Sequence, residues 1–138
     1  FHVRTMGVVA IEHDPHGGDA MNTPADLVDE FDLYAARSER ATREAVPAFA
    51  RLLKLAEERD SGQIVRVVRF LAATYNGRAF PLDPFELRAV DIAISDDMLC
   101  CLDALRWGRA DLHTLIPAGD ARVRAVIHRW GLHWPSDE

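Results

Sequence analysis

The stretch from residue 64 to residue 75 constrains the fold more than any other part of this 138-residue chain. Its apolar residues recur at intervals of three and four, which places them on one face of an α-helix. The members of this face are Ile64, Val67, Val68, Leu71, Ala72 and Tyr75. Val65 and Phe70 widen the face, so we expect a central helix that is buried on more than one side.

Helix-start signals indicate further helices before this one. Thr23 followed by Pro24 is typical of a helix start, because the hydroxyl can cap free N–H groups and proline suits the first turn. We expect Pro47 to open a second helix, with residues 37–44 as the solvated end of the first helix or as a linker. The apolar residues of the first helix also follow helical spacing: Leu27, Phe31 and Tyr34, with Val28 and Ala35.

The second half of the chain contains similar helix-start signals. Asp83-Pro84 predicts a short helix through Val90, and Asp91 either caps the next helix or lies at a bend. The next apolar face contains Ile94, Met98, Cys101, Leu102 and Leu105, and the last contains Val123, Val126, Ile127 and Trp130. We therefore predict an all-α fold, a compact single-domain bundle of about five or six helices.

The first twenty residues differ from the remainder. Gly17-Gly18-Asp19 precedes Met21, and purine-rich codons for these residues would form a ribosome-binding site before a Met start. Our hypothesis is that Met21 is the native start and that residues 1–20 are a leader or tail. The helical domain is then expected over residues 21–135, and residues 136–138 are a tail.

Composition excludes several classes of protein. The net charge of −6 argues against general nucleic-acid binding, which needs a surplus of Lys and Arg. No apolar run is long enough to cross a bilayer. Adjacent Cys100 and Cys101 cannot easily close an unstrained disulfide, which indicates a reduced, cytoplasmic protein. We expect no cofactor, no membrane association, and a monomer or homodimer.

A pattern of polar and apolar residues runs through residues 44–133. It consists of Asp60-Ser61-Gly62-Gln63, Arg66-Val67, Phe70-Leu71, Tyr75-Asn76, Asp83, Val90-Asp91 and Asp96-Asp97-Met98-Leu99. This pattern resembles a small uncharacterised all-helical bacterial family, a domain of unknown function found on plasmids and integrative elements. The resemblance implies an accessory role on a mobile genetic element, as an adaptor or as an inhibitor of a host defence complex. The family has no established activity that the resemblance could assign to this chain.

The densest acidic group contains Asp91, Asp96 and Asp97, with Asp83 and Glu86 upstream. Carboxylates can hold a metal or transfer protons, so a metal-dependent enzyme is a remote alternative. Neighbouring helix residues such as Asp96 and Asp97 point about 100° apart, which favours structural roles instead. We expect Asp97 to pair with Arg66, and either Asp60 or Ser61 to cap a helix. The predicted structural network is Asp60, Gln63, Arg66, Asp91 and Asp97.

The last helix has a basic side. Its members, with an aromatic residue beyond the helix, form the candidate partner-binding surface: Arg122, Arg124, His128, Arg129 and Trp134. Arg and Trp are enriched at the energetic centres of interfaces, although a solvated helix face is the commoner explanation. We predict a noncatalytic protein–protein interaction protein, with no catalytic or metal-binding residues. The alternative is a nucleic-acid-associated regulator that uses this basic helix.

Overall fold

The computed structural model describes residues 24–135. The predictions for residues 1–20 and 136–138 therefore lie outside the described residues. The chain divides into two units, residues 1–35 and residues 36–138.

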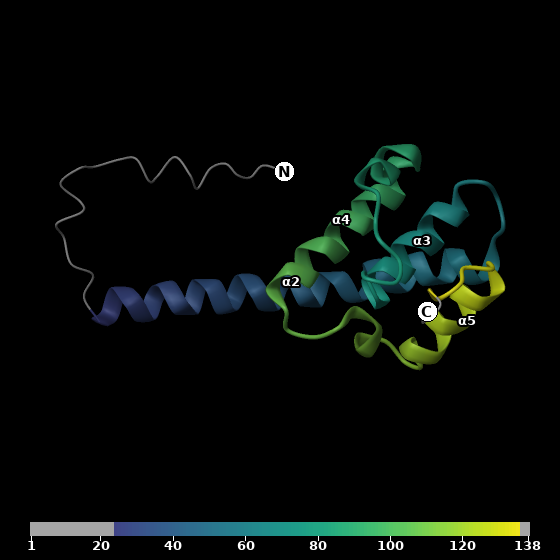
Figure 1. Cartoon of the computed structure of the whole chain (residues 1–138). Helices are drawn as coiled ribbons and strands as arrows, with labels where there is room; N and C mark the ends of the chain where they lie inside the picture. The colour runs from purple at the N-terminus through teal and green to yellow at the C-terminus, as the bar shows by residue number, and fades with distance from the viewer. Residues whose placement is uncertain (1–23, 136–138) are drawn as a thin grey trace. The chain divides into compact units, whose positions relative to one another are not determined.

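The described residues form four α-helices and two short 3-10 helices (Figure 1). In chain order these are α2 (Pro24–Glu58), α3 (Ile64–Tyr75), η2 (Pro84–Ala89), α4 (Ile92–Trp107), η3 (Leu112–Leu115) and α5 (Gly119–Arg129). No strand occurs within residues 24–135. The predicted all-α fold is confirmed for this part of the chain, where no helix is long and apolar enough to cross a membrane.

Helix α2 corrects one sequence prediction. Pro47 does not open a new helix but lies inside α2. Proline has no backbone N–H, so the Arg43 carbonyl lacks its usual donor four residues on. Both residues are exposed, so water can reach this carbonyl, while buried Ala45 and Phe49 hold the helix against the core. Tertiary packing therefore overrides the local signal for a new helix at Pro47.

Helix α3 lies at the centre of the second unit, as its apolar pattern predicted. It contacts α4, α5 and η3. Val67, Val68, Phe70 and Leu71 are fully buried. Burying each such side chain contributes about 1.5–3 kcal/mol. The other helices complete the core with Phe49, Leu52, Leu53, Met98, Cys101, Val123, Val126 and Ile127.

Two glycines beside α5 and α4 have roles that depend on their lack of a side chain. Gly108 ends α4 in the left-handed conformation, with φ of 66°. Gly119 begins α5 where η3 approaches most closely, because a Cβ atom there would lie 1.8 Å from the His113 carbonyl oxygen. Any larger residue at Gly119 would force η3 and α5 apart.

Candidate functional site

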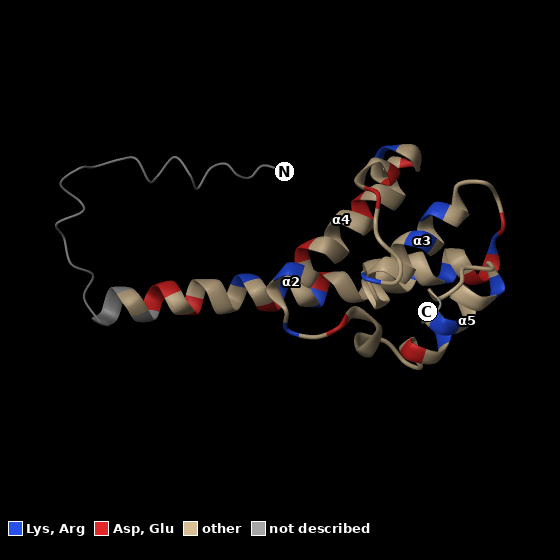
Figure 2. Cartoon of the chain, viewed as in Figure 1, with Lys and Arg blue, Asp and Glu red and all other residues tan. Residues whose placement is uncertain are grey.

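Charged side chains are distributed unevenly among the helices (Figure 2). The first turns of α2 carry acidic residues, whereas α5 carries Arg122, Arg124 and Arg129. These two segments, together with the predicted network around Asp91, are the candidate sites.

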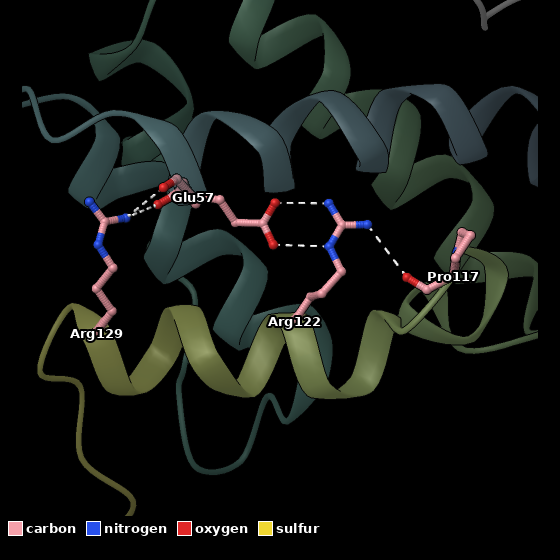
Figure 3. A network of polar contacts seen from close by, with 5 residues as sticks. Glu57, Pro117, Arg122 and Arg129 are labelled. Atoms are coloured by element: carbon pink, nitrogen blue, oxygen red, sulfur yellow. Dashed lines mark hydrogen bonds and ion pairs between the residues drawn. The ribbon is translucent and has the colours of Figure 1, made fainter.

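Two arginines of α5 bind the C-terminal end of α2 (Figure 3). The Arg122 guanidinium donates two hydrogen bonds to the Glu57 carboxylate, at 2.9 Å from Nε and 2.8 Å from Nη2. Arg129 Nη1 donates to the carbonyls of Ala56 at 2.6 Å and Glu57 at 3.2 Å. Trp130 Nε1 also donates to the Ala56 carbonyl, at 3.2 Å. These donors satisfy carbonyls that a helix end leaves unpaired, and the cation suits the negative end of the helix dipole.

The same contacts set the electrostatics of this site. Hydrogen bonding from Arg122 lowers the pKa of Glu57, and the bond to Glu57 raises the pKa of Arg122. Both side chains remain about a third exposed, at 32% and 34%, so water screens the pair. Arg122 and Arg129, two predicted partner-binding residues, thus have internal acceptors. A binding partner would have to compete with these acceptors.

Arg124 and Trp134 meet around a different residue, Tyr75. Arg124 Nε donates to the Tyr75 hydroxyl at 2.6 Å, and this hydroxyl donates to Asp120 Oδ1 at 2.5 Å. The bond to Asp120 raises the pKa of Tyr75. The Trp134 ring packs edge-on against Phe80, with ring centres 4.8 Å apart, and against Tyr75, with ring centres 6.1 Å apart. The remaining predicted partner residue, His128, is exposed.

His113 joins this group, which the sequence did not predict. Its ring centre lies 4.8 Å from that of Tyr75, and its Nε2 lies 3.9 Å from Asp120 Oδ1. Among the described residues, its buried Nδ1 has no hydrogen-bond partner. The group connects α3, η3 and α5. Its residues are far apart in sequence and follow no spacing, so no sequence signal could have revealed it.

The predicted structural network is divided among three separate contacts. Gln63 and Asp91 bind reciprocally: Gln63 Nε2 donates to Asp91 Oδ2, and the Asp91 backbone N–H donates to Gln63 Oε1, both at 3.0 Å. Asp97 accepts two bonds from Arg51, at 2.8 Å and 3.0 Å. The predicted Arg66–Asp97 pair is therefore wrong. Arg66 instead binds Glu86, because it faces η2 while Asp97 faces α2.

Glu86 is a buried acceptor that the sequence placed only among the acidic residues. Its carboxylate accepts bonds from both Arg66 and Arg69, the latter at 3.1 Å. The carboxylate is buried, and two partly exposed guanidiniums neutralise it. A buried carboxylate would be costly without such partners. The contact therefore fixes η2 on α3 and explains why Arg66 is not available to Asp97.

The loop before α3 uses backbone rather than side-chain caps. The Ser61 carbonyl accepts from the Ile64 N–H at 3.0 Å, and the N-cap residue Gln63 makes no side-chain cap bond. The predicted side-chain cap by Asp60 or Ser61 is therefore wrong. Asp60 is exposed and makes no side-chain hydrogen bond or ion pair within the described residues. The turn closes through main-chain geometry, which leaves Gln63 available to Asp91.

The two cysteines lie in surroundings that disfavour ionisation of their thiols. Burial raises the pKa of both Cys100 and Cys101, which disfavours the reactive thiolate. Asp96 is exposed, while its neighbour Asp97 pairs with Arg51. Within residues 24–135, no three His, Cys, Asp or Glu side chains are placed to hold a metal ion.

A small pocket lies near the ends of α3 and α4. Its volume is about 270 Å³. The lining residues are Thr74, Leu105, Gly108, Ala110, Asp111 and Leu112. The Thr74 hydroxyl already donates to the Leu71 carbonyl at 2.8 Å. Asp111 is the charged residue of this lining, so the pocket offers few groups that could orient a ligand.

The first turns of α2 expose large apolar side chains. The exposed fractions are 41% for Leu27, 68% for Phe31, 70% for Leu33 and 62% for Tyr34. Leu27, Phe31 and Tyr34 are separated by four and three residues, so they share one stripe of the helix. We call these three residues the apolar stripe. Its periodicity was evident from sequence, but its exposure was not.

The fold and these contacts define an all-α protein in which polar side chains connect the helices. Residues 46–131 match a family described as Family of unknown function (DUF7673). The match covers more than half of the chain, so the protein belongs to this family, as the sequence pattern indicated. No curated protein and no solved structure matches the chain. The bacterial and mobile-element setting stays a prediction.

Proposed function

We propose that this chain is a noncatalytic, cytoplasmic protein–protein interaction protein that binds through the apolar stripe of α2. The observation that carries the proposal is the exposure of Leu27, Phe31 and Tyr34 on one face of a helix. Contiguous exposed apolar side chains on a protein surface are typical of interaction sites.

The energetics support an interface of this kind. Fully burying a Phe or Leu side chain contributes about 1.5–3 kcal/mol, and aromatic residues supply much of the buried area at interfaces. Phe31 is 68% exposed, so a partner could still bury most of its side chain and gain most of this free energy. Phe31 is therefore the expected centre of the interface.

The other candidate surface supports this choice by contrast. Arg122 and Arg129 already bind acceptors at the end of α2, which weakens the alternative of a basic nucleic-acid-binding helix. The proposal also includes a biological context for the interaction. The resemblance described above suggests an accessory factor of a mobile genetic element, acting as an adaptor or as an inhibitor of a host complex.

Affinity capture from a lysate of the source cells tests the proposal, with and without nuclease and with mass spectrometry as the readout. We expect a protein partner that survives nuclease and is lost with the double variant Leu27→Ala/Phe31→Ala. Phe85→Ala is the matched control, because Phe85 is 63% exposed but lies on η2. Capture that does not depend on Leu27 and Phe31 would refute the proposal. Capture that disappears with nuclease would favour the nucleic-acid alternative.

A further inference from the structure

The segment that carries the apolar stripe has charge of one sign. Residues 24–36 contain four carboxylates, Asp26, Asp29, Glu30 and Asp32, and no basic residue. Figure 2 shows this acidic stretch along the first turns of α2. The next basic residue is Arg37, which pairs with Asp103 at 2.7 Å in the second unit. The stripe therefore lies in a local field that favours cations.

The carboxylates lie beside and behind the stripe rather than on it. At about 100° per residue, Glu30 borders Tyr34 at one edge of the stripe, whereas Asp32 points about 100° away from Phe31, farther round the helix. Both carboxylates are exposed, and neither forms an ion pair with any residue of the described part of the chain. Their charge is consequently available to a molecule that binds the stripe.

We propose that the occupant of the stripe is a protein that presents a basic amphipathic α-helix, with an apolar seam flanked by Lys or Arg. The inference rests on the proposed function and adds the chemical class of the partner. An apolar seam at three- and four-residue spacing matches the side-chain ridges of a second helix. Lys or Arg beside that seam would meet Glu30, and the other carboxylates of residues 24–36 would attract it at longer range. Such complementarity fixes register and accelerates association.

Charge also argues against the other occupants. A second copy of this chain would bring the same carboxylates against one another, whichever way the two helices ran, and like charges at an interface are costly. Nucleic acid and anionic membrane surfaces are repelled for the same reason. A basic helix gains from both the apolar stripe and the acidic segment that carries it.

Two synthetic helical peptides test the inference on the full chain by fluorescence anisotropy. Both carry Leu at three- and four-residue spacing, one with Lys and Arg beside the Leu seam and the other with Glu. We expect the basic peptide to bind at least about tenfold more tightly, a difference of about 1.4 kcal/mol. High salt should weaken this binding, because it screens exposed charges. Phe31→Ala should reduce it at least about tenfold, and the control Phe85→Ala should leave it unchanged.

Charge reversal separates specific recognition from general attraction to an acidic protein. The double variant Glu30→Lys/Asp32→Lys should lose the basic peptide and gain the acidic one. Equal binding of both peptides, binding of neither, or a Phe31-dependent dimer in sedimentation would overturn the inference. If lysate capture depends on Phe31 while the peptides are not discriminated, the proposed function stands and only the partner class fails. Capture that is independent of Phe31 instead defeats the proposed function.

Discussion

Helix α5 and the first turns of α2 contrast in how their side chains are used. The sequence of α5 suggests a solvent-facing basic surface, yet Arg122 and Arg129 bind Glu57 and the last carbonyls of α2. The first turns of α2 carry an apolar spacing that is typical of a core helix, yet Phe31 is 68% exposed. Polar residues that look functional are structural in one region, and apolar residues that look structural are exposed in the other.

The contrast shows the limit of what the spacing of apolar residues can reveal. Apolar spacing identifies the face of a helix that gains from leaving water, but it does not identify the molecule that covers that face. In α3 the covering elements belong to the same chain. On the first turns of α2 the face is exposed, which is the basis for assigning it a partner. Substitutions on the buried face of α3 and on the exposed face of α2 can test this difference.

The largest effect is expected at Phe70, on the covered face of α3. Phe70 is fully buried, so Phe70→Ala removes a ring and leaves a cavity. We expect the free energy of unfolding to fall by about 3–5 kcal/mol. Urea denaturation followed by circular dichroism measures this change. Phe70→Leu keeps more of the volume and should cost less, so it remains measurable if the alanine variant does not fold. A loss below about 1 kcal/mol for Phe70→Ala would show that α3 is not central to the core.

A smaller loss is expected for Arg129→Ala. This substitution removes the donor to the Ala56 and Glu57 carbonyls at the end of α2. Bonds that involve a charged group contribute about 1.5–3 kcal/mol, and the retained bond from Trp130 to Ala56 should limit the loss to about 1–2 kcal/mol.

Arg109→Ala is the control for Arg129→Ala. Arg109 is exposed and has no ion pair within residues 24–135, so its loss should change the unfolding free energy by less than about 0.5 kcal/mol. Equal effects of the two substitutions would mean that the α5 arginines are a solvated surface. The contrast between α5 and the first turns of α2 would then disappear.

Much of the fold could be predicted because buried helix faces place apolar residues at regular spacing in the sequence. The buried apolar face of α3 follows directly from helix geometry. Pro47 could not be placed correctly, because the packing that keeps α2 continuous comes from other helices. The close approach at Gly119 was also hidden, because it depends on where η3 meets α5.

The polar contacts were less predictable than the helices. Gln63 and Asp91 both belong to the predicted structural network, and they bind each other. The predicted partner of Asp97 was wrong. Arg51 and Arg66 are equally plausible in sequence, and only the fold brings Arg51 within reach. Periodicity shows on which face of its own helix a residue lies. Predicting an ion pair also requires the relative positions of two helices.

A third, smaller effect concerns acid and the Glu57–Arg122 pair. The pair lowers the pKa of Glu57 from its ordinary value of 4.5. A lowered folded-state pKa contributes stability above pH 4.5, and this contribution is lost as pH falls through the folded-state value. We expect the free energy of unfolding of wild type to exceed that of Glu57→Gln by less than about 1 kcal/mol at pH 7. This difference should shrink below pH 4.5.

Urea titrations of wild type and Glu57→Gln from pH 7 to pH 3 measure this gap. Glu58→Gln provides the control, because Glu58 is exposed and has no ion pair within the described residues. Its unfolding free energy at pH 7 should lie within about 0.5 kcal/mol of wild type. A gap between wild type and Glu57→Gln that stays constant across this pH range would show that Arg122 does not bind Glu57 in solution.

The smallest effect on stability is expected for Phe31→Ala, the counterpart of Phe70→Ala on the exposed face of α2. Phe31 is 68% exposed, so truncation removes little buried area, and alanine favours the helix more than phenylalanine does. We expect the free energy of unfolding to change by less than about 0.5 kcal/mol, while partner capture is lost. Urea denaturation of the full chain, beside Phe70→Ala, measures the first quantity. A loss of more than about 2 kcal/mol would mean that Phe31 is covered within the chain, because exposed positions do not show losses of that size. The apolar stripe would then belong to the core, and the proposed interaction surface would have to lie elsewhere.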